Sequence, residues 1–235
     1  IAARDRLVLF FHYLLVDALM VGGFDNDLDG VIEENLPNFK GKLDWLGLQY
    51  YFRAGVTGNG GLLPVLKLTP CFSTFDFGSC VEPIDRSYCV PTMGYEHYAP
   101  GIQTVIAAFG ARFPGLPLVI SEGGIGTEVG ERRAENIVRA LEHIHAARRS
   151  GVDVRGYYHW SLYDNFEWAE GFGPRFGLYS VDYATYERTP TLGADVLAQI
   201  TEGRKLSRAL RSKHGGKGPM TTEGSPPEDG ACQKY

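Results

Sequence analysis

Cysteine is scarce in this sequence, with four residues among 235. Cys71, Cys80 and Cys89 fall in one loop-like stretch, Cys232 lies near the end, and no two of them have CxxC spacing. This pattern is not typical of a zinc site or of a disulfide-rich scaffold. We expect the cysteines to be structural or incidental, with a disulfide as the second interpretation and a metal site as the third.

An excess of positive charge is also lacking. The chain has 23 Lys and Arg against 28 Asp and Glu, a net charge of −5 and a pI near 5.7. Proteins that bind nucleic acids usually carry a basic face, so a nucleic-acid partner is not expected and a small neutral ligand fits better. A content of 44% hydrophobic and 22% charged residues excludes disorder throughout.

Long hydrophobic runs are absent as well. The most apolar stretch, "LVLFFHYLLVDALMV", is interrupted by His12, Tyr13 and Asp17 and is shorter than the ~20 residues that span a membrane. Its apolar residues recur with helical period, which predicts an amphipathic core helix rather than a signal peptide or membrane anchor. Because the chain begins at Ile1 inside this helix, we expect the later part of something longer. The compartment stays open, with the cytoplasm slightly favoured.

The rest of the chain alternates between short apolar strands and amphipathic helices. Strands are predicted at 43–51, 118–121 and 152–160, with helices at 101–113 and 131–151 between them. This alternation is typical of βα units around a parallel sheet. From residue 204 the sequence turns basic and then rich in Pro, Gly, Ser and Glu, so we expect one domain over 1–203 and a disordered tail over 204–235.

Several segments resemble the later half of the family 1 glycoside hydrolases. They are, in order, "LDWLGLQYY", "MGYEHYAPGI", "LVISEGGI", "GVDVRGYYHWSLYDNFEWAEGF" and "RFGLYSVDY". Members of that family are retaining β-glycosidases on a (β/α)8 barrel. The resemblance runs from about Arg4 to Gly203, and the tail beyond has no counterpart that we identify. It implies an α/β fold with about the last three βα units of a TIM barrel, completed by a missing N-terminal portion.

The resemblance assigns the catalytic roles to two residues. Glu122 falls at the position of the family's nucleophile, and Tyr51 matches the tyrosine that donates a hydrogen bond to it. A retaining glycosidase needs a carboxylate that attacks the anomeric carbon and a second carboxyl group that serves as acid and then as base. This chemistry would explain why a carboxylate ends a buried strand, and it requires no metal or organic cofactor.

Further positions match the family's sugar-binding residues. Glu167 corresponds to a glutamate that accepts hydrogen bonds from the outer hydroxyls of the sugar, where a carboxylate favours neutral over phosphorylated substrates. The substrate contacts implied in this way come from Trp160, Glu167, Trp168, Phe176, Tyr95 and Gln49. Asp164, Asn165 and Arg175 are expected to brace the loop instead.

The sequence departs from the family pattern in ways that bear on activity. Gln49 and Gly123 stand where the family has asparagines, and Tyr95 stands where it usually has tryptophan. The Asn-Glu-Pro motif that carries the acid/base glutamate does not occur, and Glu82 in "VEP" is not expected to replace it. We therefore expect a partner, the N-terminal half of the same barrel, as a separate chain or nicked fragment.

Three functional hypotheses follow. The first is the nucleophile-bearing half of a retaining β-glycosidase that acts on β-glucosides or related neutral β-glycosides. The alternative is a non-catalytic sugar-binding or scaffold half of a degenerate glycosidase. A truncated gene product without a stable fold of its own is the third.

Overall fold

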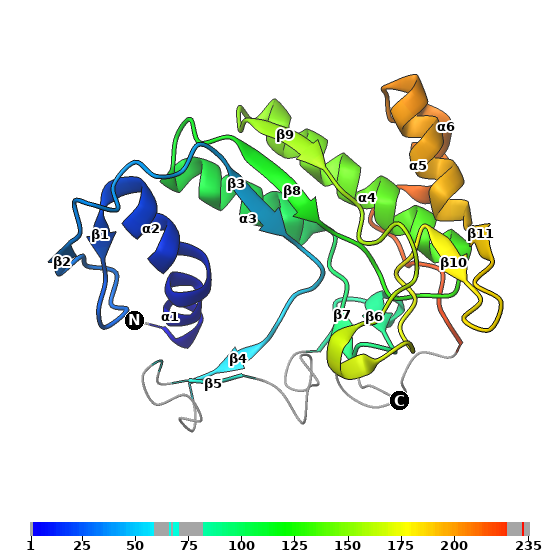
Figure 1. Ribbon diagram of the computed structural model, residues 1–235, viewed down its shortest axis with the longest axis horizontal. Helices are drawn as coiled ribbons and strands as arrows, with labels where there is room; N and C mark the ends of the chain where they lie inside the picture. The colour runs from blue at the N-terminus through cyan, green and yellow to red at the C-terminus, as the bar shows by residue number, and fades with distance from the viewer. Residues whose placement is uncertain (1, 59–65, 67, 71–81, 225–231, 233–235) are drawn as a thin grey trace.

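The computed structural model describes residues 2–58, 66, 68–70, 82–224 and 232. Its centre is a parallel sheet in the order β3 (Leu46–Gln49), β8 (Leu118–Glu122) and β9 (Val154–Tyr157). All three strands were predicted. Helices α3 (Pro100–Arg112) and α4 (Gly130–Arg149) return the chain between strands and lie on one face of the sheet (Figure 1). The βα alternation of the sequence is thereby confirmed.

The core lies between the sheet and these two helices. Leu118 and Ile120 of β8 alternate along the strand, and neither has any exposed surface. Ile102, Ile106 and Phe109 follow at helical spacing on α3 and are buried against the same cluster. Each Å² of apolar surface that is buried stabilises the fold by about 25 cal/mol. This apolar packing is therefore the main force that holds α3 to the sheet.

The first helix forms as predicted but is only partly buried. It consists of α1 (Ala3–Val8), a π-helical turn (Leu9–Tyr13) and α2 (Leu14–Val21). Asp17 accepts two hydrogen bonds from the guanidinium of Arg112, at 2.9 and 2.6 Å, which attaches α2 to α3. On the outer side of the helix the side chains of Phe10, Phe11 and Leu15 are exposed.

In the loops that the structure describes, there are four two-stranded ribbons and two short 3-10 turns (Arg86–Tyr88 and Trp168–Glu170). The ribbons pair β1 (Gly23–Phe24) with β2 (Glu34–Asn35), β4 (Val56–Thr57) with β5 (Thr69–Pro70), β6 (Cys89–Val90) with β7 (Tyr95–Glu96), and β10 (Tyr179–Val181) with β11 (Arg188–Pro190). The β6–β7 hairpin and the loop after β9 lie beyond the carboxyl ends of the parallel strands (Figure 1).

The tail is a correction to the sequence analysis. Helix α5 (Leu192–Gly203) packs along α4, and residues 208–214, expected to be disordered, form α6 (Arg208–His214) against α4. Met220 is 4% exposed, and Cys232 forms a disulfide with Cys89. Contacts with α4 and this cross-link supply the stabilisation that the composition of the tail suggested was missing. Cys71 and Cys80 lie outside the described residues.

The sheet has two open sides. Within the described ranges, no strand pairs with the outer edge of β3 or of β9. Trp45 before β3 and Tyr158 after β9 are more than half exposed. Three parallel strands with helices on one face are the arrangement that consecutive βα units of a (β/α)8 barrel have, as the predicted fold class requires.

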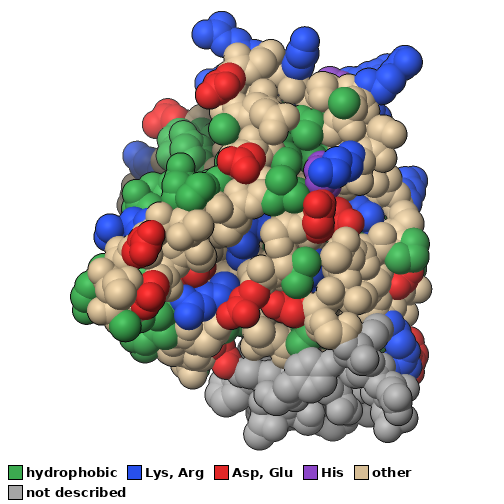
Figure 2. Space-filling model, turned by 90° about the vertical axis from the view of Figure 1, so that its right-hand side faces the viewer, with side chains coloured by type: hydrophobic (Ala, Val, Ile, Leu, Met, Phe, Trp, Pro, Cys, Tyr) green, Lys and Arg blue, Asp and Glu red, His purple; other side chains and the backbone are tan. Residues whose placement is uncertain are grey.

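The surface and the helices give two further observations. On the face shown in Figure 2, acidic and basic side chains are interspersed rather than separated. Among the helices that the structure describes, none is both long and apolar enough to cross a bilayer.

Candidate active site

The residues predicted for the site all line one cavity of about 440 Å³ at the carboxyl ends of the three parallel strands. They are Gln49, Tyr51, Tyr95, Glu122, Trp160, Glu167, Trp168 and Phe176. Phe52 and Met93 complete the lining and were not predicted. Phe52 directly follows the tyrosine pair at the end of a strand, so its position was a usable signal. Met93 begins the segment "MGYEHYAPGI" two residues before Tyr95, so its place in that segment was a usable signal as well.

Glu122 and Tyr51 are brought together by the parallel pairing of β3 and β8. Gln49 pairs with Glu122 in the register, after an irregularity at Leu48, and Tyr51 lies two residues beyond β3. The Tyr51 hydroxyl donates a hydrogen bond of 2.7 Å to Oε2 of Glu122. Burial raises the pKa of Tyr51, and the bond to Glu122 raises it further. The phenol therefore stays protonated and keeps its donor over the pH range of proteins.

A buried histidine that the sequence analysis missed holds the backbone of Tyr51. Nε2 of His97 is 3.1 Å from the amide nitrogen of Asn136, and Nδ1 is 3.0 Å from the carbonyl oxygen of Tyr51. Since an amide nitrogen only donates, Nε2 accepts and Nδ1–H donates to Tyr51. Burial lowers the pKa of His97 to about 4, and the charges of Arg132 and Arg139 contribute to this shift. The ring is therefore neutral, and a lone His in the sequence gave no sign of this role.

The second carboxylate in the cavity is Glu167. The indole Nε1 of Trp160 donates to its Oε2 at 3.4 Å. Burial raises the pKa of Glu167 and the negative charge of Glu122 raises it as well, while the bond from Trp160 opposes the shift. The neighbouring Trp168 has a positive φ of 50° and is 79% exposed, so its indole remains available at the rim.

The glycines after Glu122 let two loops approach closely. The N–H of Trp160 donates to the carbonyl of Gly123 at 3.0 Å, and the Tyr157 hydroxyl donates to the same carbonyl at 3.3 Å. A Cβ on Gly124 would lie 2.1 Å from the carbonyl oxygen of Trp160. Glycine at position 123 admits many backbone conformations. The turn after Glu122 is nevertheless packed and hydrogen-bonded.

Aromatic rings form the apolar wall of the cavity. Tyr95 and Phe176 are each 3% exposed. Phe52 stacks on Tyr95 with ring centroids 4.6 Å apart, and Tyr51 meets Phe176 edge to face at 6.0 Å. A cavity lined by both carboxylates and aromatic rings can hold a molecule that has both hydroxyl groups and an apolar face.

The expected bracing residues connect the loop after β9. Asp164 accepts a hydrogen bond from the backbone N–H of Gly177 at 2.8 Å and pairs with Arg175 at 3.3 Å. The side-chain amide of Asn165 donates to the hydroxyl oxygen of Ser161 at 3.0 Å.

A cluster of carboxylates outside the cavity comprises Asp25, Asp27, Asp29 and Glu33, with candidate ligand atoms within 4.8 Å of one another. The oxygens of its buried member, Asp25, already accept the backbone N–H groups of Asp29 and Gly30.

Comparison with known proteins decides the family. Residues 10–205 match the signature of Glycosyl hydrolase family 1. The chain belongs to this family. It is 34% identical over 195 residues to a beta-galactosidase of Sulfolobus acidocaldarius, an alignment that covers 80% of this chain and 38% of the relative. The structure of a beta-glycosidase from Pyrococcus horikoshii superposes with a TM-score of 0.73 at 32% identity, covering 92% of this chain and 46% of that one.

Membership of glycosyl hydrolase family 1 does not by itself settle activity. A relative from Oryza sativa subsp. japonica, 28% identical over 90% of this chain and 45% of its own length, carries the name probable inactive beta-glucosidase 14. The chain spans less than half the length of each of these relatives. The chemistry of the whole protein therefore has to be argued from the site.

Proposed function

We propose that this chain supplies the nucleophile-bearing part of a retaining β-glycosidase. The observation that carries the proposal is the 2.7 Å hydrogen bond from Tyr51 to Glu122 inside a cavity that also contains Trp160 and Glu167. Glu122 attacks the anomeric carbon with one carboxylate oxygen, the leaving group departs, and a covalent glycosyl-enzyme forms. Water then cleaves that ester and returns the carboxylate.

The acid that protonates the leaving group comes from elsewhere in the barrel. The sequence has no Asn-Glu-Pro motif, and Glu82 is not among the residues that line the cavity. The open edges of β3 and β9 are where further strands would close the barrel, because unpaired strand edges are costly to leave exposed. In this proposal the N-terminal half of the same barrel, on the same or a separate chain, contributes those strands and the acid/base carboxyl group.

The substrate class follows from the charges in the cavity. Two carboxylates, Glu122 and Glu167, face the same space, so an anionic sugar phosphate would be repelled. The hydroxyl groups of a neutral sugar can donate to Glu167, and its apolar face can stack on the indoles. Neutral β-glycosides such as β-glucosides are the substrates that fit.

A non-catalytic sugar-binding or scaffold role is the second candidate. The observation in its favour is that Gln49 lines the cavity where the family has a shorter amide, together with the presence of an inactive-named relative. Under this alternative the cavity binds a glycoside but Glu122 forms no covalent bond.

Covalent trapping separates the two candidates. A 2-deoxy-2-fluoro β-glycoside with a good leaving group should label the complete barrel, seen as a mass shift on the peptide that contains Glu122. Glu122→Gln should abolish the label, whereas Glu82→Gln, which alters a largely exposed carboxylate outside the cavity, should retain it. Binding of the glycoside without any label would favour the sugar-binding alternative, and a label on another residue would refute the assignment of Glu122.

A further inference from the structure

Residues 217–223, here called the tail strap, lie outside the part of the chain that matches the family and run from α6 past α4 to the β6–β7 hairpin (Figure 1). The hydroxyl of Tyr88 donates to the carbonyl of Lys217 at 2.9 Å. The backbone N–H of Met220 donates to the hydroxyl oxygen of Ser87 at 2.8 Å. The tail strap is thereby attached to the residues immediately before β6.

Buried arginines on α4 attach the tail strap from the other side. Arg139 donates to the carbonyls of Gly218 and Pro219 at 2.7 and 3.0 Å. Arg132 is 1% exposed and donates to the carbonyl of Thr221 at 2.8 Å, while the same guanidinium donates to carbonyls of Ser87 and Cys89 at the start of the hairpin. One charged group therefore holds the tail strap and the hairpin together. Charge-assisted bonds of this kind are about twice as strong as neutral ones.

The side chain of Met220 belongs to a buried cluster that shares Tyr95 with the lining of the cavity. It is 4% exposed in a cluster with Tyr88, Val90, Tyr95 and Ile125. Tyr95 pairs with Val90 across the hairpin and lines the cavity, where it stacks on Phe52. Met220 thus belongs to the buried cluster in which the ring of Tyr95 packs.

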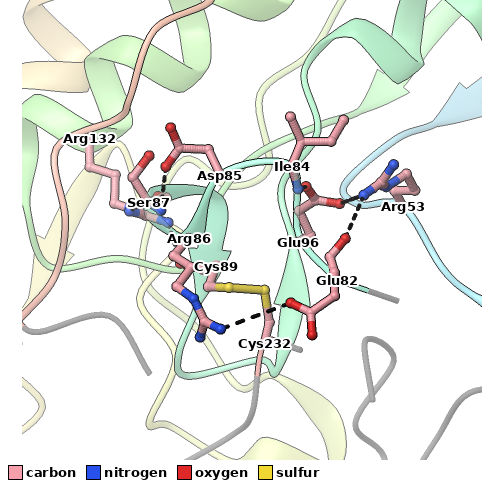
Figure 3. Close-up of a disulfide and its surroundings, with 10 residues drawn as sticks. All are labelled: Arg53, Glu82, Ile84, Asp85, Arg86, Ser87, Cys89, Glu96, Arg132 and Cys232. Carbon is pink, nitrogen blue, oxygen red and sulfur yellow. Dashed lines mark hydrogen bonds and ion pairs between the residues drawn. A yellow bond between two sulfur atoms is a disulfide. The ribbon is translucent and has the colours of Figure 1, made fainter. Parts of the chain in front are cut away.

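The tail strap is fixed at both ends. Upstream, α6 packs on α4, and Arg211 of α6 pairs with Glu142 at 2.8 Å. Downstream, Cys232 is 1% exposed and bonded to Cys89, the first residue of β6, across 143 positions of sequence (Figure 3). A segment held in this way can keep the hairpin in one position.

We propose that the tail strap sets the position of the aromatic wall formed by Tyr95 and Phe52, with Met220 as the positioning residue. The proposal deepens the proposed function and rests on it, because the wall is taken as part of the glycoside site. The chemical class that the wall selects is a glycoside with an aromatic aglycone, since the ring of Phe52, stacked on the buried Tyr95, can offer a flat apolar face. Residues within the 10–205 match form the cavity, and the tail strap beyond them adjusts one side of it.

The test measures affinity, so it does not depend on turnover. Isothermal titration of the complete barrel with an aryl thio-β-glycoside gives Kd for the wild type and for Met220→Ala. We expect Kd to rise by roughly 10-fold, the lower end of the range for one missing methylene in an apolar pocket, because Met220 acts on the ligand through Tyr95 and Phe52. Met220→Leu, which conserves volume, should restore affinity. Thr222→Ala, a change at an exposed position of the tail strap, should match the wild type.

A second comparison covers the case in which Met220→Ala does not fold. Thr221→Val removes the hydroxyl that donates to Glu135 at 2.9 Å without opening a cavity. It should also raise Kd for the aryl ligand, by a smaller factor than Met220→Ala. A methyl thio-β-glycoside should show a smaller change than the aryl ligand with both variants. Unchanged affinity for the aryl ligand in folded Met220→Ala and Thr221→Val would overturn the proposal. Equal losses for aryl and methyl ligands would also overturn it, because they indicate general destabilisation.

Fluorosugar labelling of the same samples reports on the proposed function separately. If the wild type binds the aryl ligand but is not labelled at Glu122, the catalytic role of Glu122 is refuted. The differences in Kd between the variants still decide the role of the tail strap. If the enzyme is labelled at Glu122 but its Kd for the aryl ligand is unchanged by both substitutions, the proposed function stands and the role of the tail strap is refuted. A wild type that binds neither ligand overturns both.

Discussion

The hydroxyl of Tyr51 and the carboxylate of Glu122 lie 2.7 Å apart, although 71 positions separate them in the chain. Tyr51→Phe should slow fluorosugar labelling of Glu122 by roughly 10- to 100-fold, the loss expected for a hydrogen bond to a charged group. Stopped-flow release of the leaving group measures this rate.

Tyr50→Phe is the matched control for that change. Its hydroxyl donates to the backbone carbonyl of Tyr98 at 2.5 Å and not to Glu122. It should leave the labelling rate per folded molecule close to that of the wild type. Equal rates in the two variants would show that the hydroxyl of Tyr51 has no role in the reaction.

Glu167→Gln tests recognition of the sugar. The substitution keeps the shape of the side chain but removes the charge that strengthens hydrogen bonds from sugar hydroxyls, so KM for a neutral β-glucoside should rise by roughly 10-fold or more. The rise should be smaller for a substrate that lacks one outer hydroxyl. Glu170→Gln changes a carboxylate of the same loop that does not line the cavity and serves as control. An unchanged KM in Glu167→Gln would show that Glu167 does not bind the sugar hydroxyls.

The neutral state of His97 predicts a dependence of stability on pH. Burial lowers its folded-state pKa to about 4, below the ordinary 6.5, so the unfolded chain binds an extra proton between these values. The contribution of the neutral His97 to the free energy of unfolding is fully present above about pH 6.5. It decreases as the pH falls toward 4, by about 3 kcal/mol in total. His159, whose pKa burial lowers to about 3, adds a loss of the same sign.

Urea unfolding at a series of pH values isolates the contribution of His97. Gln at this position can donate to Tyr51 and accept from Asn136 without titrating. In His97→Gln the free energy of unfolding should therefore fall less steeply with decreasing pH, by the slope that corresponds to about one proton. His145→Gln, at an exposed position on α4, should follow the wild type. A slope as steep in His97→Gln as in the wild type would contradict a buried neutral ring.

Gly124 marks the closest approach between the loops after β8 and β9. A Cβ there would lie 2.1 Å from a backbone oxygen of Trp160, which cannot move without displacing the strand end. Gly124→Ala should therefore lower the free energy of unfolding by about 2 kcal/mol or more. At Gly203, where the nearest side-chain atom would be 3.8 Å away, alanine should be tolerated. Melting temperatures of both variants provide the measurement, and equal values would contradict the close contact.

The sequence was most informative where local pattern and burial agree. Leu118 and Ile120 alternate in a short apolar run, and the structure places them in the central strand β8. The prediction of disorder was wrong for the described part of the tail, because the stability of that part comes from partners far away in sequence. Arg132, Arg139 and Cys89 fix it, and no local composition encodes those contacts.

The sequence motifs predicted the residues that line the cavity, but they did not predict the residues that hold these side chains in place. Tyr95 and Phe176 could be named from their motifs and line the cavity. His97, Asn136 and Met220 could not, since each matters only through a neighbour that the fold supplies. A side chain that acts through another residue leaves no pattern along the chain.

The sequence by itself determined the family, the alternation of strands and helices, and the carboxylate at the end of β8, because apolar periodicity and motif spacing are local properties of the chain. The tertiary structure decided that Tyr51 meets Glu122, that a neutral His97 holds Tyr51, and that Met220 of the tail packs in one cluster with Tyr95. These contacts depend on strand register and on long-range burial, which arise only when distant segments fold against one another.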